Sequence, residues 1–161
     1  EEAAKCFSKA IALTPEYAEA QSNLGVTLHE LGRLEEAEAS CRKAIAISPG
    51  YAEAYYNLGN TLQKRARFKE AKEGYKQAIV LNTNFPEAHF NIGNMLLDLG
   101  QLDEASESYQ KAAQLKKHFG EAIAGLGTVL MKKGQHKKSI KKIREGNGSI
   151  FFDVDNGLRI E

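Results

Sequence analysis

The chain is poor in residues that interrupt helices and in residues that build covalent or metal-bound scaffolds. Of its 161 residues, three are proline, two are cysteine and none is tryptophan. Two cysteines in this length do not make a disulfide framework or a zinc cluster. No apolar run approaches the roughly 18 residues of a membrane span. Proline interrupts helices, so its scarcity suits a mostly helical chain.

Net charge is also nearly absent. The 22 Lys and Arg residues are balanced by 21 Asp and Glu residues, which leaves a formal charge of +1. Nucleic-acid and membrane-surface proteins usually carry a large charge of one sign, so neither kind of partner is expected. No basic start followed by an apolar stretch is visible, so the cytoplasm is the default expectation for location. What the chain does have is 42% hydrophobic residues, enough for a buried core.

One motif recurs along the chain at a fixed interval. The segment AEAQSNLG at residues 18–25 returns 34 residues later as AEAYYNLG at 52–59 and again as PEAHFNIG at 86–93, and a weaker copy, GEAIAGLG, lies at 120–127. Equal offsets without insertions do not arise by chance, and they predict an array of repeats. Residues 1–17 fit the same frame as the second half of a preceding repeat.

Each repeat has the spacing of two amphipathic helices. In the first full repeat, Leu24, Leu28 and Leu31 form one helical stripe that ends at Gly32. A second stripe runs through residues 34–47 and ends at Pro49-Gly50. The sequence thus predicts a helix pair in every repeat.

This pattern resembles the tetratricopeptide repeat family. The residues that carry the resemblance in the second full repeat are Leu58-Gly59, Leu62, Ala71, Tyr75 and Ala78. The resemblance covers residues 1 to about 146 and implies an all-α fold, a right-handed superhelical solenoid of antiparallel helix pairs. It divides the chain into the second helix of a truncated repeat (1–17), three full repeats (18–51, 52–85 and 86–119), a degenerate C-terminal repeat (120–148) and a non-repeat tail (149–161).

Asparagines recur on the first helix of the repeats. Asn23, Asn57 and Asn91 stand in register, and Asn60 and Asn94 lie three residues further on, on the same helix face. Asparagine is a mediocre helix former, so solubility alone does not explain it there. A carboxamide offers both a donor and an acceptor, so it can pair with the backbone of an extended peptide. The alternative interpretation is that the asparagines were inherited by duplication and pair within the array.

The series is similar to the asparagine ladder in the tetratricopeptide superhelix of the O-linked N-acetylglucosamine transferases. That resemblance implies a peptide-binding groove lined by the five asparagines. Tyr56 and Phe90 occupy neighbouring positions and are expected to supply apolar side-chain pockets. Gly125 takes the asparagine position in the last repeat, so the ladder is expected to fade there.

The predicted function is a protein-protein interaction scaffold that binds a protein or peptide segment, without catalysis and without a cofactor. No pair of the four histidines has metal-ligand spacing on one helix face, so no metal site is predicted. The competing hypothesis is a substrate-recruiting segment of a larger enzyme, such as a glycosyltransferase, whose catalytic domain lies outside this chain. End-to-end self-association is a further expectation, because a truncated first repeat leaves one side of a helix bare.

The C-terminal end departs from the pattern in two ways. The run from Lys132 to Arg144 carries six lysines and one arginine without an acidic residue, which indicates either a solvated helix face or a surface for phosphate or an acidic partner. Residues 149–161 then leave the repeat, and an apolar, β-prone run is followed by turn residues and a second apolar run. This tail is predicted to cap the array, to enter the groove of another chain, or to begin a further domain.

Overall fold

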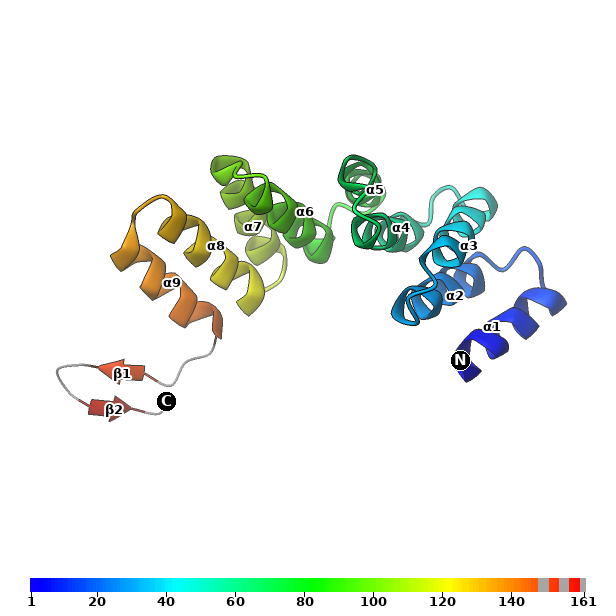
Figure 1. Cartoon of the computed structure of the whole chain (residues 1–161), viewed down its shortest axis with the longest axis horizontal. Coiled ribbons are helices and arrows are strands. Elements are labelled where there is room, and N and C mark those ends of the chain that lie inside the picture. Colours follow the sequence, from blue (N-terminus) through cyan, green and yellow to red (C-terminus); the bar gives the residue numbers. More distant parts are fainter. Residues whose placement is uncertain (148–150, 154–156, 160–161) are drawn as a thin grey trace. The chain divides into compact units, whose positions relative to one another are not determined.

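The computed structural model describes residues 1–147, 151–153 and 157–159, with side-chain surroundings described as far as Lys142. These residues fall into two compact units, Glu1–Asn84 and Phe85–Glu161 (Figure 1). The first unit contains α1 (Glu2–Leu13), α2 (Ala18–Glu30), α3 (Leu34–Ile47), α4 (Ala52–Lys64) and α5 (Phe68–Leu81). The second contains α6 (Pro86–Asp98), α7 (Leu102–Leu115), α8 (Gly120–Lys132) and α9 (His136–Asn147), followed by strands β1 (Phe151–Asp153) and β2 (Gly157–Arg159).

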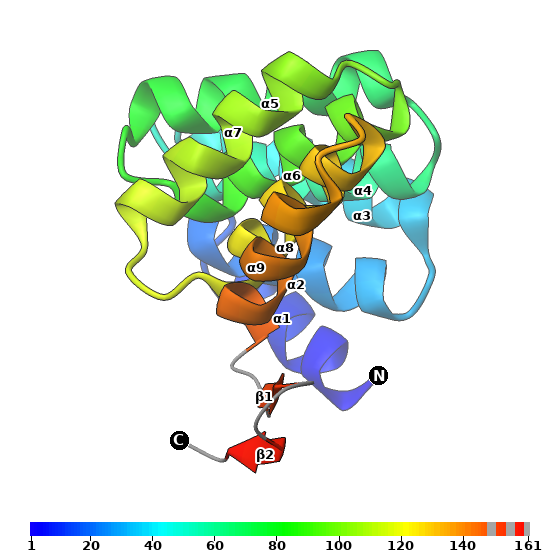
Figure 2. The same ribbon diagram turned by 90° about the vertical axis from the view of Figure 1, so that its left-hand side faces the viewer.

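Within each unit every helix packs against the next one along the chain. In the first unit α1 contacts α2, α2 contacts α3, α3 contacts α4 and α4 contacts α5. In the second unit α6, α7, α8 and α9 are linked in the same way, as the ribbon shows from a second direction (Figure 2). The prediction of an all-α solenoid made from helix pairs is confirmed, apart from the short hairpin that follows α9.

Alternating small and large residues bring the two helices of a repeat together. A Cβ atom built on Gly59 of α4 would lie 2.7 Å from the ring of Tyr75 on α5, and one on Gly93 would lie 2.8 Å from Tyr109 on α7. In the preceding repeat a Cβ atom built on Gly25 would lie 2.6 Å from the sulfur of Cys41. Only glycine permits these approaches, so the first helix of each pair rests directly on the large side chain of the second.

The turn between the two helices of a repeat needs a left-handed backbone residue. Gly32, Gly100 and Gly134 take this conformation, with φ between 73° and 77°. In the second full repeat the same position is held by Ala66, with φ of 59°. Alanine pays a steric cost there that glycine does not, so this turn is strained while keeping the geometry of the others.

In the last helix pair a hydrogen bond adds to the close packing of the two helices. Ser139 occupies the position of Ala37, Ala71 and Ala105 in the other repeats and is fully buried. Its hydroxyl donates to the carbonyl oxygen of Gly127 at 2.7 Å, so the extra polar atom is paired. The degenerate repeat therefore retains a close contact between α8 and α9.

The tail contains a small hairpin. β1 pairs antiparallel with β2, and Phe152 is opposite Leu158 in the register. The β-prone character predicted for this part of the sequence is confirmed for these two strands. The turn residues expected at 153–157 include 154–156, which lie outside the described residues, and none of the three roles predicted for the tail is tested by the hairpin.

Candidate functional site

In the first unit the candidate asparagines lie on α2 and α4, and each is half-buried. The amide nitrogen of Asn57 donates to the hydroxyl of Ser22 on α2 at 3.0 Å. This bond links the first helices of two successive repeats. The backbone carbonyl of Asn23 accepts the Thr27 hydroxyl at 3.0 Å within α2. One part of the predicted ladder thus makes a contact inside the array.

Asn60 is held by the large aromatic residue of the second helix. The oxygen of the Tyr75 hydroxyl lies 2.8 Å from Oδ1 of Asn60 and 2.6 Å from Oε1 of Gln63. One hydroxyl proton serves one acceptor, so one of the two carboxamides must turn its NH₂ group toward the tyrosine oxygen. A tyrosine buried in the helix pair thereby fixes two amides on the first helix.

A shallow groove opens beside these amides. It has a volume of about 430 Å³ and is lined by His29 of α2, by Asn60, Gln63 and Lys64 of α4, and by Phe68 at the start of α5. The Phe68 side chain is half exposed. Tyr56, predicted to form a side-chain pocket, lies with its ring centroid 5.7 Å from that of Tyr75. The groove therefore combines amide groups, one cation and apolar surface.

The second unit repeats the tyrosine–amide contact. The Tyr109 hydroxyl donates to Oδ1 of Asn94 at 2.7 Å, the counterpart of the Tyr75–Asn60 bond one repeat earlier. Burial, together with the charge of Asp98, raises the pKa of Tyr109 to about 12, so this hydroxyl stays protonated and remains a donor. Asn91 lies half-buried on the same helix, α6.

Phe90 lies in an aromatic cluster of the second unit. Its ring centroid is 5.8 Å from that of Tyr109 and 5.2 Å from that of Phe119. The ammonium of Lys116 lies 4.6 Å from the centroid of the Phe119 ring and also pairs with Glu87 at 2.8 Å. Phe90 is half-buried, so one part of its ring supports the cluster while another part meets solvent.

The gap in the ladder has a steric reason. A Cβ atom on Gly125 of α8 would meet the Tyr109 ring at 2.7 Å, so an asparagine side chain does not fit without displacing the ring. In the first unit the corresponding pair is Asn57 and Cys41. Tyr109 therefore leaves no room for an asparagine at position 125, whereas Cys41 leaves room for Asn57. Residue size does not decide the pairing in every repeat, since Tyr75 precedes Asn91 at the same separation.

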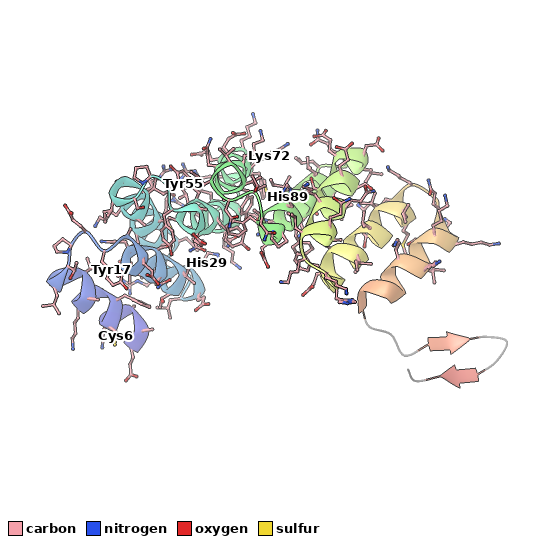
Figure 3. All side chains as sticks on the ribbon, turned by 180° about the vertical axis from the view of Figure 1, so that it is seen from behind. Cys6, Tyr17, His29, Tyr55, Lys72 and His89 are labelled. Carbon is pink, nitrogen blue, oxygen red and sulfur yellow. The ribbon has the colours of Figure 1, made fainter. Side chains whose placement is uncertain are left out.

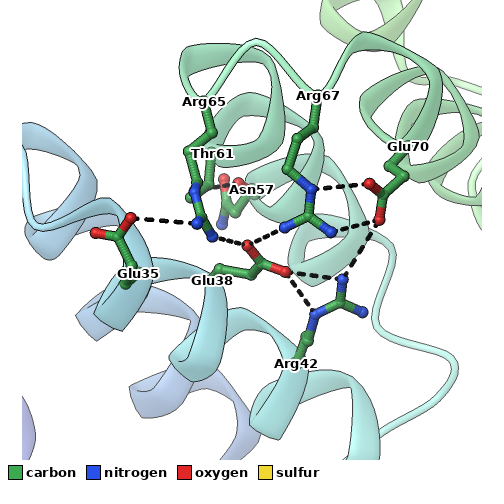
Figure 4. Close-up of polar contacts among 8 residues, drawn as sticks. All are labelled: Glu35, Glu38, Arg42, Asn57, Thr61, Arg65, Arg67 and Glu70. Carbon is green, nitrogen blue, oxygen red and sulfur yellow. Dashed lines mark hydrogen bonds and ion pairs between the residues drawn. The ribbon is translucent and has the colours of Figure 1, made fainter.

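A charged cluster between α3, α4 and α5 was not anticipated from the sequence. Glu38 of α3 is buried, and its carboxylate accepts hydrogen bonds from Arg42 at 2.9 Å, from Arg67 at 2.7 Å and from Arg65 (Figure 4). Arg67 also forms two bonds to Glu70, at 2.8 and 2.6 Å. The Glu38 pairs with Arg65 and Arg67 join residues 27 and 29 positions apart, beyond the reach of local helix pairing.

The electrostatic effect of this cluster appears in the pKa of Glu38. Burial by itself raises that pKa, but the hydrogen bonds from Arg42 and Arg67 outweigh burial and hold it below its ordinary value. Glu38 therefore stays ionised at neutral pH. The cluster ties two successive repeats together through charge, in addition to their apolar contact.

The remaining reactive side chains show no catalytic grouping. Cys41 is buried, and burial raises the pKa of its thiol to about 12, while Cys6 is exposed on α1 (Figure 3). Within the described ranges, no three His, Cys, Asp or Glu side chains come together in a way that could hold a metal ion. Among the helices described, none has the length and apolar character needed to cross a lipid bilayer.

Models of the tetratricopeptide repeat match residues 1–52, 52–85 and 86–119. The chain belongs to the tetratricopeptide repeat family. The resemblance predicted from the repeat pattern is confirmed. No curated protein sequence gives a match.

Solved structures with the same fold include MamA and PilF proteins. The crystal structure of MamA is 26% identical over 90% of this chain and 85% of its own, with a TM-score of 0.79. MamA of Desulfovibrio magneticus is 22% identical over 92% of this chain and 84% of its own, with a TM-score of 0.78, a likeness in fold alone. PilF of Pseudomonas aeruginosa is 25% identical over 81% of this chain and 61% of its own, with a TM-score of 0.72. These similarities support a protein-interaction scaffold.

Proposed function

We propose that this tetratricopeptide repeat chain binds extended polypeptide segments along its first helices, through carboxamides that its own tyrosines hold in place. The main support is the contact that appears in both units, Tyr75 with Asn60 and Tyr109 with Asn94. An amide fixed before the ligand arrives loses less conformational freedom on binding than a mobile one. The two contacts give the array preorganised groups at the same place in successive repeats.

The chemistry of the neighbouring side chains suits a peptide with little sequence preference. A carboxamide can pair with the N–H and the C=O of a peptide backbone, and each such neutral bond contributes only about 0.5–1.5 kcal/mol. Tyr56 and Phe90 are half-buried beside the amides and offer apolar surface for alternate ligand side chains. Several repeats must act together to give useful affinity.

Other contacts of the predicted ladder have a different part in this proposal. Asn57 is bonded to Ser22, and that bond aligns α2 with α4. Asn57 is therefore compatible with both interpretations made from the sequence, pairing within the array and contact with a peptide. A carboxamide with one bonded N–H keeps a second N–H and a carbonyl oxygen for further hydrogen bonds. Asn23 and Asn91 complete the series at the same register in their repeats.

The experiment measures capture of a fluorescently labelled library of unstructured peptides. Asn60→Ala and Asn94→Ala, singly and together, should weaken capture by about threefold to tenfold per site, one neutral hydrogen bond each. Tyr75→Phe should weaken it less, since the amides remain but lose their anchor. The control is Asn84→Ala, which removes an exposed amide in the segment that follows α5.

The proposal fails if the double variant keeps its helical circular dichroism and captures peptides as well as the parent chain. Equal losses from Asn84→Ala would point to a general effect of amide removal and would also contradict it. A loss of helical content in Asn57→Ala would assign that residue to packing alone.

A further inference from the structure

A second set of grooves lies between successive second helices. Each groove is floored by two leucines of the first helix that lies between them. The volumes are about 580 Å³ for the groove between α1 and α3, about 370 Å³ for that between α3 and α5, and about 460 Å³ for that between α7 and α9. The floors, in the same order, are Leu24 with Leu28, Leu58 with Leu62, and Leu126 with Leu130.

The groove between α3 and α5 neutralises its own charges. Arg42 on the α3 wall lies 3.9 Å from Glu70 on the α5 wall. Glu70 also pairs with Arg67 at 2.6 Å, and Glu73, another lining residue, pairs with Lys76 at 2.9 Å. Two cations, Arg42 and Lys69, and two carboxylates, Glu70 and Glu73, line this groove, so it has little net charge to offer a ligand.

The groove between α7 and α9 is built differently. Its α7 wall carries the uncharged Ser106, Gln110 and Gln114, and Lys142 lines its α9 wall. The four α9 positions that correspond to Lys69, Glu70, Glu73 and Gly74 of α5 are all lysine, namely Lys137, Lys138, Lys141 and Lys142. The same frame positions thus carry mixed charge on one groove wall and only positive charge on the other.

We infer that the groove between α7 and α9 binds an acidic, amphipathic segment of a partner protein. Its apolar side chains would lie on Leu126 and Leu130, and its carboxylates would face the lysines of α9. Charge complementarity carries this assignment, because a positive wall beside an apolar floor matches a segment with leucine-like residues on one face and acids on the other. The site lies on the second-helix side and does not depend on the proposed peptide groove.

A nucleic acid fits this surface less well than an acidic peptide. The described side chains of α8 and α9 include no Phe, Tyr or Trp for base stacking. Exposed Asp103, Glu104 and Glu107 on α7 would repel a long polyanion that continued past the groove, and Asp103 already pairs with Lys133. A short acidic segment avoids these carboxylates.

The test uses a labelled helical peptide with leucine on one face and glutamate on the other, and a control peptide with lysine in place of glutamate. The variant is Lys138→Glu combined with Lys141→Glu, which gives α9 the charges found at the same positions of α5. Both lysines are exposed, and glutamate at position 138 lies in the first turn of α9, where it is favourable, so this variant should fold. Lys111→Glu combined with Lys117→Glu changes the same amount of charge at two exposed lysines that lie outside α9.

The expected result is binding of the acidic peptide alone, weakened about tenfold or more by the α9 variant, because like charges face each other across the interface. The control variant should change affinity less than threefold at 0.15 M salt, where separated charges are largely screened. Leu130→Ala should also weaken binding, which a purely ionic contact would not show.

Three outcomes would overturn the inference. Equal weakening by the control variant would mean a general charge effect. Tighter binding of a single-stranded oligonucleotide or of anionic vesicles than of the acidic peptide would assign the surface to another class of ligand. Absence of measurable peptide binding, with helical content intact, would leave α9 as a solvated face.

Discussion

The helices α3, α4 and α5 and the helices α7, α8 and α9 occupy the same frame of the repeat but differ in what joins them. Glu38 anchors three arginines in the first region, and its counterpart in the second is Ser106. The ion pair of Arg65 with Glu35 has a counterpart in that of Lys133 with Asp103. The comparison shows that the backbone arrangement does not require the charged cluster.

The two regions share the small residues that set the distance between helices and the leucines at the floors of their grooves. Ala37, Ala71 and Ala105 are fully buried at one recurring position, where α9 has the hydrogen-bonded Ser139. Side chains facing the grooves vary freely around this core. The repeat frame therefore fixes the spacing of the helices, while the groove walls differ in charge between the two regions.

The largest expected effect follows from placing the asparagine of the first region into the second. Gly125→Asn should lower the free energy of unfolding by roughly 2–3 kcal/mol, because the new side chain overpacks against Tyr109. Thermal unfolding followed by circular dichroism measures this. A double variant, Gly125→Asn with Tyr109→Cys, copies the pair Asn57 and Cys41 and should recover part of the loss. No recovery would contradict the size-matching argument.

Removing the central carboxylate tests the charged cluster. Glu38→Gln should cost about 2 kcal/mol, because it removes the buried negative charge that pairs with three partly exposed arginines. Ser106→Ala, at the matching position, should change stability by less than about 0.5 kcal/mol. Urea unfolding of both variants provides the measurement, and similar losses at the two positions would remove the distinction between the regions.

The parent chain and the Glu38→Gln variant should also differ in their stability at acid pH. The pKa of Glu38 is below its ordinary value of 4.5, so its contribution is complete above the pKa of the unfolded chain and is lost as the pH falls through the lower folded-state pKa. The parent chain should therefore lose stability more steeply than Glu38→Gln below pH 4.5. Parallel curves would show that Glu38 does not carry this dependence.

Substitutions in the turns between paired helices should change stability less, and in opposite directions in the two regions. Ala66→Gly should stabilise the chain by up to about 1 kcal/mol, because glycine accepts the left-handed backbone without steric cost. Gly134→Ala, at the equivalent turn of the second region, should destabilise it by a similar amount. Melting temperatures that shift in the same direction for both variants would refute the strain at Ala66.

The smallest effect concerns the ion pair at the edge of α7 and α8. Asp103→Ala should change the unfolding free energy by no more than about 0.5 kcal/mol, because its carboxylate is almost fully exposed. High salt should reduce even this difference. A double-mutant cycle with Lys133→Ala measures the coupling directly, and a coupling above 1 kcal/mol would mean that this pair resembles the Glu38 cluster after all.

The fold was predictable because its determinants repeat. Gly59 and Tyr75 recur one interval later as Gly93 and Tyr109, and the period of 34 residues exposes such positions without coordinates. The contact of Tyr75 with Asn60 was missed, although the same separation of 15 residues recurs for Tyr109 and Asn94 and would have pointed to it.

The Glu38 cluster was beyond sequence reasoning for a physical reason. Its partners Arg65 and Arg67 lie in the next repeat, and the interaction occurs once, so neither helix periodicity nor internal repetition indicates it. The sequence also did not show which side chains line each groove. The lysines of α9 were visible as a basic run, but the place of Lys142 beside Leu126 and Leu130 required the packing of α9 on α8.

The buried thiol of Cys41 makes local separation of the helices around it measurable. With its pKa near 12 and its sulfur against Gly25, Cys41 is closed to alkylating reagents while α2 rests on α3. Cys6 is exposed and reacts regardless of that contact. The ratio of the two labelling rates, followed by mass spectrometry, therefore reports how often a single helix pair separates while the rest of the chain stays folded.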